Sequence, residues 1–200
     1  MPALATKNPG SRPVPGPPPS GLTHALVRAN GLETRGFCDW HVEPAMRFEA
    51  ASIWWADRGP RPRPHEGLDL CAYRGRDQAL QRLDAETQIP AMYDGTVVRL
   101  CEDFIGRSAM MEHRFPGLPG WFYTLYGHTR PRAGLAPGQA VRAGEIVARL
   151  APITRPGSTV LPHLHISVGW SPEPVAPERL DWNTLPDVLY LLDPLPLLET

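Results

Sequence analysis

The 200-residue chain lacks several features that would place it in a common class of protein. It has three cysteines, Cys38, Cys71 and Cys101, and no Cys-x-x-Cys pair, which disfavours a structural zinc knuckle. It has no run of about 18 apolar residues, so we expect no membrane span. Its net charge of −1 gives no reason to expect binding to nucleic acid. The cysteine spacing leaves one disulfide and three reduced thiols as open alternatives.

The composition changes along the chain and suggests four regions. Residues 1–20 are rich in proline, glycine and small polar residues and contain no apolar block of the kind that a signal peptide needs. We expect them to form a disordered leader. An N-terminal extension (21–41), one folded domain (42–170) and a C-terminal tail (171–200) would follow.

The 25 prolines and 18 glycines favour many turns and few helices. We predict a mainly β, antiparallel single domain with few short helices. A short polar helix is predicted at 77–86 and a second short helical turn at 185–192. The predicted strands, each bounded by Gly- or Pro-bearing turns, lie within 46–55, 96–100, 109–113, 121–126, 140–150 and 163–168.

Two histidines flank one apolar residue in Pro162-His163-Leu164-His165. Side chains at i and i+2 of a strand point to the same face, so both imidazoles project to one side. A hydrophobic strand does not need such a pair, whereas a zinc site does. One histidine can bind the metal while the other handles protons beside it.

A second pair, His65 and Asp69, lies about a hundred residues earlier in His-Glu-Gly-Leu-Asp. Prolines before it and Gly67 within it argue against a helix, and we expect Gly67 to allow a bend that turns both side chains toward one point. Imidazole and carboxylate are ordinary zinc ligands. Together with His165 they would form a three-ligand site with a fourth position left for water, as in a catalytic site.

A third element lies between these two. Tyr126-Gly127-His128 ends a predicted strand before a turn-rich segment. Other candidates have simpler interpretations. His113 ends an apolar strand and is expected to be structural or at the surface. Trp54 and Trp55 could line a groove, although at least one of them should be buried.

In this order the motifs resemble those of the lysostaphin-type (LytM-like) zinc metallopeptidases, which cut peptide cross-links in bacterial cell walls. The resemblance covers roughly residues 42–170. The matching segments are His65-Glu-Gly-Leu-Asp69, Ile89-Pro-Ala-Met-Tyr-Asp-Gly-Thr-Val-Val98, Tyr126-Gly-His128, Gly138-Gln-Ala-Val-Arg-Ala-Gly-Glu-Ile-Val147 and Pro162-His-Leu-His165.

The resemblance implies a lysostaphin-like open barrel of the barrel-sandwich type, and a zinc-dependent endopeptidase that acts on peptidoglycan peptides. It implies one Zn²⁺ per chain, held by His65, Asp69 and His165. It also implies that His128 and His163 are catalytic, while their division of acid and base roles stays open. We expect a monomer that works in the periplasm or outside the cell; because no signal peptide is visible, the cytoplasm stays open as an alternative.

The chain departs from the family pattern in a few places. The family often continues the closing motif with Phe and Glu, where this chain has Ile166 and Ser167. The loop 114–120 looks like an insertion in a hairpin.

The alternative function is a non-catalytic zinc-binding module that binds cell wall or activates another hydrolase. The hairpin around Gly138 also resembles biotinyl carrier domains, but these present a lysine at a turn, and no lysine follows Lys7.

Overall fold

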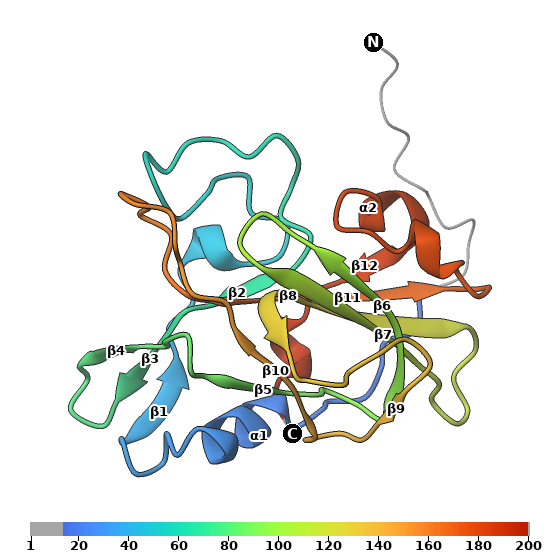
Figure 1. The fold of residues 1–200 in the computed structure, drawn as a ribbon, viewed down its shortest axis with the longest axis horizontal. Helices are drawn as coiled ribbons and strands as arrows, with labels where there is room; N and C mark the ends of the chain where they lie inside the picture. The colour runs from blue at the N-terminus through green and yellow to red at the C-terminus, as the bar shows by residue number, and fades with distance from the viewer. Residues whose placement is uncertain (1–13, 200) are drawn as a thin grey trace.

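The computed structural model describes residues 14–199, so most of the predicted leader 1–20 lies outside the described residues. A nine-stranded antiparallel sheet runs through the molecule (Figure 1). Six strands follow one another in the order β12-β11-β8-β7-β6-β9, while β2 pairs with β11 and β10 pairs with β5 and β8. Its strands are β2 (Leu68–Leu70), β5 (Gln88–Pro90), β6 (Gly95–Glu102), β7 (Arg107–His113), β8 (Trp121–Pro131), β9 (Ala140–Val141), β10 (Ile146–Leu150), β11 (Leu164–Ser171) and β12 (Tyr190–Leu192).

A smaller antiparallel sheet and a few short helices complete the described part of the chain. The small sheet has the order β1-β3-β4, with β1 at Phe37–Trp40, β3 at Ala72–Gly75 and β4 at Leu80–Arg82. Among the described residues, no helix is long and apolar enough to cross a membrane. The helices are α1 (Leu22–Ala29), α2 (Leu185–Val188) and the 3-10 turns η1 (Pro44–Met46), η2 (Pro177–Arg179) and η3 (Leu195–Leu197).

The prediction of a mainly antiparallel β fold with few short helices is confirmed. The four predicted strands at 96–100, 109–113, 121–126 and 163–168 lie within β6, β7, β8 and β11, apart from His163, and 140–150 holds β9 and β10. Over the described residues the path of paired strands stays open and does not close into a barrel. The loop 114–120 connects β7 and β8, as expected of an insertion in a hairpin.

The predicted helix at 77–86 is wrong. The Asp77 carboxylate accepts a hydrogen bond from the Ala79 N–H (3.0 Å), and Gln78 has a left-handed backbone with φ of 63°. This side chain to backbone bond closes a turn instead of starting a helix. Leu80–Arg82 then pairs with β3 as strand β4. The second prediction, at 185–192, is half right, because α2 gives way to β12 at Tyr190.

The predicted strand at 46–55 is also wrong. Met46 ends a 3-10 turn, and Glu49 has a left-handed backbone with φ of 60°, which a strand does not accommodate. The Glu49 N–H donates instead to the carbonyl of His65 (2.8 Å). The segment is therefore a loop that lies beside the entry to β2, and it brings Trp54 and Trp55 to the same part of the molecule as His65.

Helix α1 was not predicted, although it packs into the main core. Leu22 and Leu26, one turn apart, are both buried in the same cluster as Leu68 and Ile166 of the large sheet. The Ser20 N–H donates to the carbonyl of Leu197 (2.9 Å). The segments that flank the predicted domain 42–170 thus contribute to its packing. All three cysteines are free thiols.

His113 is a structural histidine. Its ring is 1% exposed, with Nδ1 2.9 Å from the carbonyl oxygen of Asp94 and Nε2 2.9 Å from the hydroxyl of Thr124. Burial lowers the pKa of His113 to about 4, and the Asp94 contact opposes this shift only in part. The folded chain therefore keeps this imidazole neutral under mildly acidic conditions in which an unfolded chain would protonate it.

This shift predicts a pH dependence of stability. The free energy of unfolding should fall as the pH drops from about 6.5 to about 4, because only the unfolded state gains a proton; the contribution is about 3 kcal/mol. His113→Gln should lose this part of the slope, while replacement of the exposed His24 by Gln should keep it. Urea unfolding of the chelated proteins across this range measures it. Parallel pH profiles for wild type and His113→Gln would contradict the prediction.

Candidate active site

Strands β2 and β11 place two of the predicted site residues opposite each other. Asp69 pairs with His165 in the antiparallel register, so their side chains lie on the same face of the sheet. His65 precedes β2, and its Nδ1 lies 2.9 Å from the carbonyl oxygen of Arg47. Because a carbonyl only accepts, Nδ1 carries the hydrogen and the lone pair of Nε2 faces Asp69 and His165.

Gly67 acts differently from the prediction. Its φ is not in the left-handed region, so an unusual bend is not what requires a glycine. A Cβ at this position would lie 2.3 Å from the carbonyl oxygen of Ile166 and 2.7 Å from Nε2 of His165. The glycine is needed because the backbone before β2 passes directly against β11, and this close approach brings His65 within reach of His165.

The three predicted ligand residues meet at one point and are all buried. His165 Nδ1 lies 2.9 Å from Asp69 Oδ1 and 3.1 Å from His65 Nε2, and the Asp69 to His65 separation is 3.3 Å. Tetrahedral zinc with bonds of about 2.0–2.1 Å would hold its ligand atoms about 3.3 Å apart. Two nitrogens and one carboxylate oxygen at these separations fit a zinc ion.

The carboxylate of Asp69 is held from both sides. Burial alone would raise its pKa, but His65 and the hydrogen bond from His165 hold the pKa of Asp69 well below its usual range. Its second oxygen, Oδ2, accepts a hydrogen bond from the Trp54 indole N–H (2.7 Å) and lies 3.5 Å from the Arg61 guanidinium. Trp54 is the buried member of the tryptophan pair, as expected for at least one of them.

The Trp54 contact predicts an effect on metal affinity. Trp54→Phe keeps an aromatic ring at this position but removes the only indole N–H bonded to Asp69 in the described residues. The Asp69 carboxylate then loses a contact that orients it. Loss of such an outer contact typically weakens metal binding by about 10–100-fold. Titration against a chromophoric chelator measures this, with Trp55→Phe as the matched control. Equal zinc affinity in Trp54→Phe and wild type would show that the contact does not orient Asp69.

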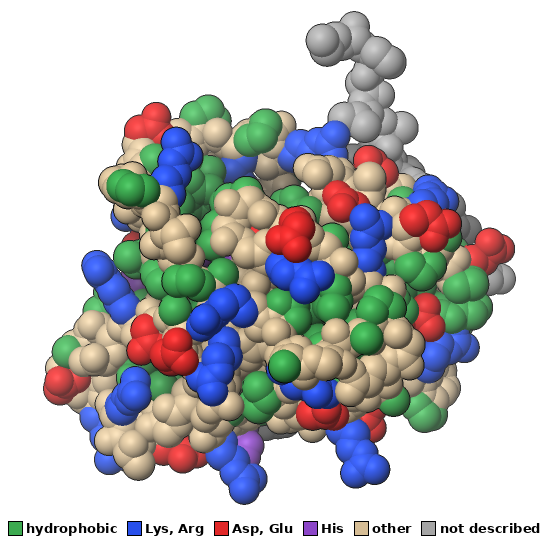
Figure 2. Space-filling view, viewed as in Figure 1, with side chains coloured by type: hydrophobic (Ala, Val, Ile, Leu, Met, Phe, Trp, Pro, Cys, Tyr) green, Lys and Arg blue, Asp and Glu red, His purple; other side chains and the backbone are tan. Residues whose placement is uncertain are grey.

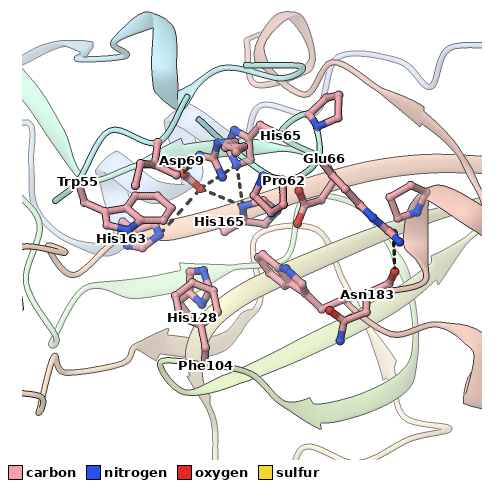
Figure 3. A pocket seen from close by; sticks show the side chains of 16 residues that line it. Trp55, Pro62, His65, Glu66, Asp69, Phe104, His128, His163, His165 and Asn183 are labelled. Carbon is pink, nitrogen blue, oxygen red and sulfur yellow. Dashed lines mark hydrogen bonds and ion pairs between the residues drawn. The ribbon is translucent and has the colours of Figure 1, made fainter. Parts of the chain in front are cut away.

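His163 and His128 lie beside these three residues (Figure 3). His163 directly precedes β11, and its Nδ1 lies 2.8 Å from the carbonyl of Leu161, which leaves Nε2 as the acceptor, 3.9 Å from Asp69 Oδ1. Burial lowers the pKa of His163 to about 4. The rings of His128 and His163 are 4.7 Å apart, so the two imidazoles face one space.

His128 has an unusual backbone. It lies at an irregularity of the β7–β8 pairing, where Arg107 pairs with Thr129 but Ala109 pairs with Tyr126, so β8 contains an extra residue. At this bulge His128 takes a left-handed conformation with φ of 61°. The bulge turns the side chain out of the regular alternation of β8 and toward His163.

Asp103 is a site residue that the sequence analysis missed. Its carboxylate accepts hydrogen bonds from the His128 ring Nδ1 (3.1 Å) and the His128 backbone N–H (2.8 Å). It also accepts from the backbone N–H groups of Ile105 (2.9 Å) and Gly106 (2.7 Å) and from the Ser108 hydroxyl (2.9 Å). Burial would raise the pKa of Asp103, but the bonds from His128 and Gly106 hold it well below its usual range.

Aromatic side chains are among the residues that line a cavity of about 440 Å³ over these histidines. Trp55 and Phe104 line it, and Trp182 packs on the His165 ring with a centroid separation of 4.2 Å. A Cβ at Gly127 would lie 2.5 Å from the Trp182 ring, so the glycine of the Tyr-Gly-His motif makes room for it. Trp182 belongs to the predicted tail 171–200 and was not predicted to reach the site.

More than half of the chain matches a known peptidase family. The model of peptidase family M23 matches residues 63–177. The catalytic domain of lysostaphin from Staphylococcus simulans is 16% identical, with a TM-score of 0.49 over 86% of this chain and 98% of that one. LytU is 20% identical, with a TM-score of 0.44 over 77% of this chain and 84% of that one. The search of curated proteins found no match.

The matched range contains His65, Asp69, His128, His163 and His165, together with the strands that position them. It also spans most of the region 42–170 in which the sequence motifs were found. The chain belongs to peptidase family M23.

Proposed function

We propose that this peptidase is a zinc-dependent endopeptidase that hydrolyses peptide cross-links of bacterial peptidoglycan. The observation that carries the proposal is the meeting of two imidazole nitrogens and one carboxylate oxygen within 2.9–3.3 Å of one another. Two further histidines, whose rings are 4.7 Å apart, face the same cavity. A structural zinc site would be closed by a fourth protein ligand, whereas this donor set has three among residues 14–199.

In this proposal His65 Nε2, Asp69 Oδ1 and His165 Nδ1 hold one Zn²⁺. The ion would polarise the scissile carbonyl and lower the pKa of an adjacent water molecule toward about 7. Arg47 accepts the Nδ1 hydrogen of His65 and leaves Nε2 of that ring for the ion, while Ser167 Oγ lies 2.8 Å from Nε2 of His165 and can accept a hydrogen there when Nδ1 binds the ion. Ser167, at a position where this chain departs from the family, thus still supplies a partner for that ring.

His128 and His163 have the two proton-handling roles in this proposal. Each ring has its Nδ1 bonded to an acceptor, Asp103 for His128 and the Leu161 carbonyl for His163. The lone pair of Nε2 on each ring can accept a proton from water, and the protonated ring can then donate it to the leaving amine. The aromatic side chains of Trp55, Phe104 and Trp182 restrict water around the peptide.

The substrate places the activity where peptidoglycan lies, so we propose that the protein works in the periplasm or outside the cell, as a monomer. Acidic and basic side chains are interspersed on the face shown in Figure 2.

We keep residues 42–170 as the proposed catalytic domain. The extension adds helix α1 to its core, and the tail adds Trp182 to its cavity.

Purified cell-wall sacculi provide the test. Zinc-loaded protein should release new amino groups from sacculi, and mass spectrometry of the fragments should identify the peptide bond that was cut. The chelated protein should be inactive and should recover activity when zinc is restored. Binding of one zinc per chain without amino-group release, on sacculi of several cross-link chemistries, would refute the enzyme and favour a wall-binding module.

A further inference from the structure

We propose that Asp103 is a positioning residue for His128, and that it holds the imidazole in the tautomer with hydrogen on Nδ1 so that the Nε2 lone pair faces the cavity. This inference rests on the proposed function for its catalytic meaning. Its geometry involves none of the three proposed metal ligands, because Asp103 lies between β6 and β7 and its side chain bonds to His128 on β8.

One carboxylate controls both the backbone and the ring of His128. Asp103 Oδ2 accepts the backbone N–H at 2.8 Å, and Oδ1 lies 3.1 Å from Nδ1 of the ring. The left-handed backbone of His128 is a conformation that non-glycine residues rarely adopt, so it persists where surrounding contacts impose it. Asp103 supplies such a contact, and the same contact sets the direction in which the ring projects.

The carboxylate is itself held in place before it meets the ring. The N–H groups of Ile105 and Gly106 and the hydroxyl of Ser108 all donate to it. A Cβ at Gly106 would lie 2.6 Å from the Ala151 Cβ and 2.8 Å from the Thr129 carbonyl oxygen, so the turn is pressed against the sheet. The Asp103 side chain is 1% exposed. These donors hold the Asp103 carboxylate in one orientation. A carboxylate accepts hydrogen bonds and does not donate them, so the hydrogen between Asp103 and His128 must lie on Nδ1 of the ring.

This arrangement also distinguishes His128 from His163. The Nδ1 of His163 faces the neutral carbonyl of Leu161, whereas the Nδ1 of His128 faces an anion. A carboxylate stabilises the positive charge that an imidazole gains when it accepts a proton, and it fixes the ring's tautomer and direction. The two histidines therefore have different hydrogen-bond acceptors at Nδ1, although their rings face the same cavity. Phe104, next to Asp103 in the chain, packs edge-on against the His128 ring with a centroid separation of 4.5 Å.

The tautomer can be measured directly. Long-range ¹⁵N–¹H spectra of the labelled protein, with the His128 signals assigned by their loss in His128→Ala, should show hydrogen on Nδ1 and a lone pair on Nε2 in the wild type, with and without zinc. In Asp103→Ala the same ring should give a mixture of tautomers. A wild-type His128 with hydrogen on Nε2 would overturn the proposal, even if every variant at position 103 failed to fold.

Kinetics separate positioning from simple support of the fold. Asp103→Ala should keep its zinc and its KM for wall peptides but lose kcat by about 100-fold or more, since it removes the support of a proton-transfer group. Asp84→Ala is the matched control, because it removes another carboxylate that accepts a backbone N–H (Glu86, 2.9 Å) but lies outside the cavity, and its kcat should stay close to wild type. Equal losses in both variants, or unchanged kcat in Asp103→Ala, would overturn it. If wild type itself proves inactive on sacculi, the NMR result still decides whether Asp103 positions the ring.

Discussion

Asp69→Ala and His165→Ala are each expected to reduce bound zinc from about one ion per chain to a small fraction, and to abolish hydrolysis. Each substitution removes one of the three donor atoms that lie within 2.9–3.3 Å of one another. It also leaves the other ligands without their buried partner. Asp69→Ala would leave the Trp54 indole N–H without its acceptor as well. Elemental analysis of the purified variants measures the zinc content.

The control for this experiment is His24→Ala, which removes an exposed histidine remote from the cavity and should keep its zinc. Circular dichroism should show that both ligand variants keep the β fold, so that loss of zinc is not simply unfolding. A full complement of zinc in either ligand variant would mean that the proposed ligand set is incorrect.

His128→Ala and His163→Ala are expected to keep zinc and to lose hydrolysis of peptidoglycan peptides by about 100-fold or more. The physical reason is that both rings face the cavity while their Nε2 atoms lie outside the three-ligand group. Proton transfer, not metal binding, should therefore fail. Amino-group release from sacculi, compared at equal zinc content, measures the loss.

His113→Gln serves as the control for the removal of a buried imidazole, because its ring lies outside the cavity and bonds to Asp94 and Thr124. It should retain hydrolysis at neutral pH. Full activity in both His128→Ala and His163→Ala would show that the proton-handling roles belong to other groups. Loss of zinc in either of them would instead move that histidine into the ligand set.

Much of the candidate site could be predicted because its residues lie close together in short sequence motifs. His163 and His165 are separated by one residue, and His65 and Asp69 by three, so short-range spacing alone suggests that each pair acts together. The strands were predictable for a similar reason, since alternating apolar residues between glycine and proline turns depend on neighbours in the chain. Helix α1 had such a pattern in Leu22 and Leu26, but its single buried face is short and was overlooked.

Asp103 could not be found in this way. An aspartate before a glycine-bearing turn is ordinary, and its role arises only when the β7–β8 bulge brings His128 to it across 25 residues of chain. Trp182 is similar, because its contact with His165 depends on a segment after β11 folding back over the sheet. The errors at 46–55 and 77–86 have a related cause. Each segment contains a left-handed residue, Glu49 or Gln78, that the sequence pattern does not reveal, and in 77–86 the Asp77 side chain also bonds to the backbone.

The pairing of β2 with β11 has a consequence for how the protein is made. Asp69 and His165 face each other across 96 residues of chain, and β11 is among the last strands in the sequence. Synthesis runs from the N-terminus, so His65 and Asp69 leave the ribosome well before the strand that carries their third partner. Contacts of such long sequence separation also form late in folding, because chain entropy opposes them. A nascent chain therefore holds no complete set of the three proposed metal ligands until β11 has been synthesised.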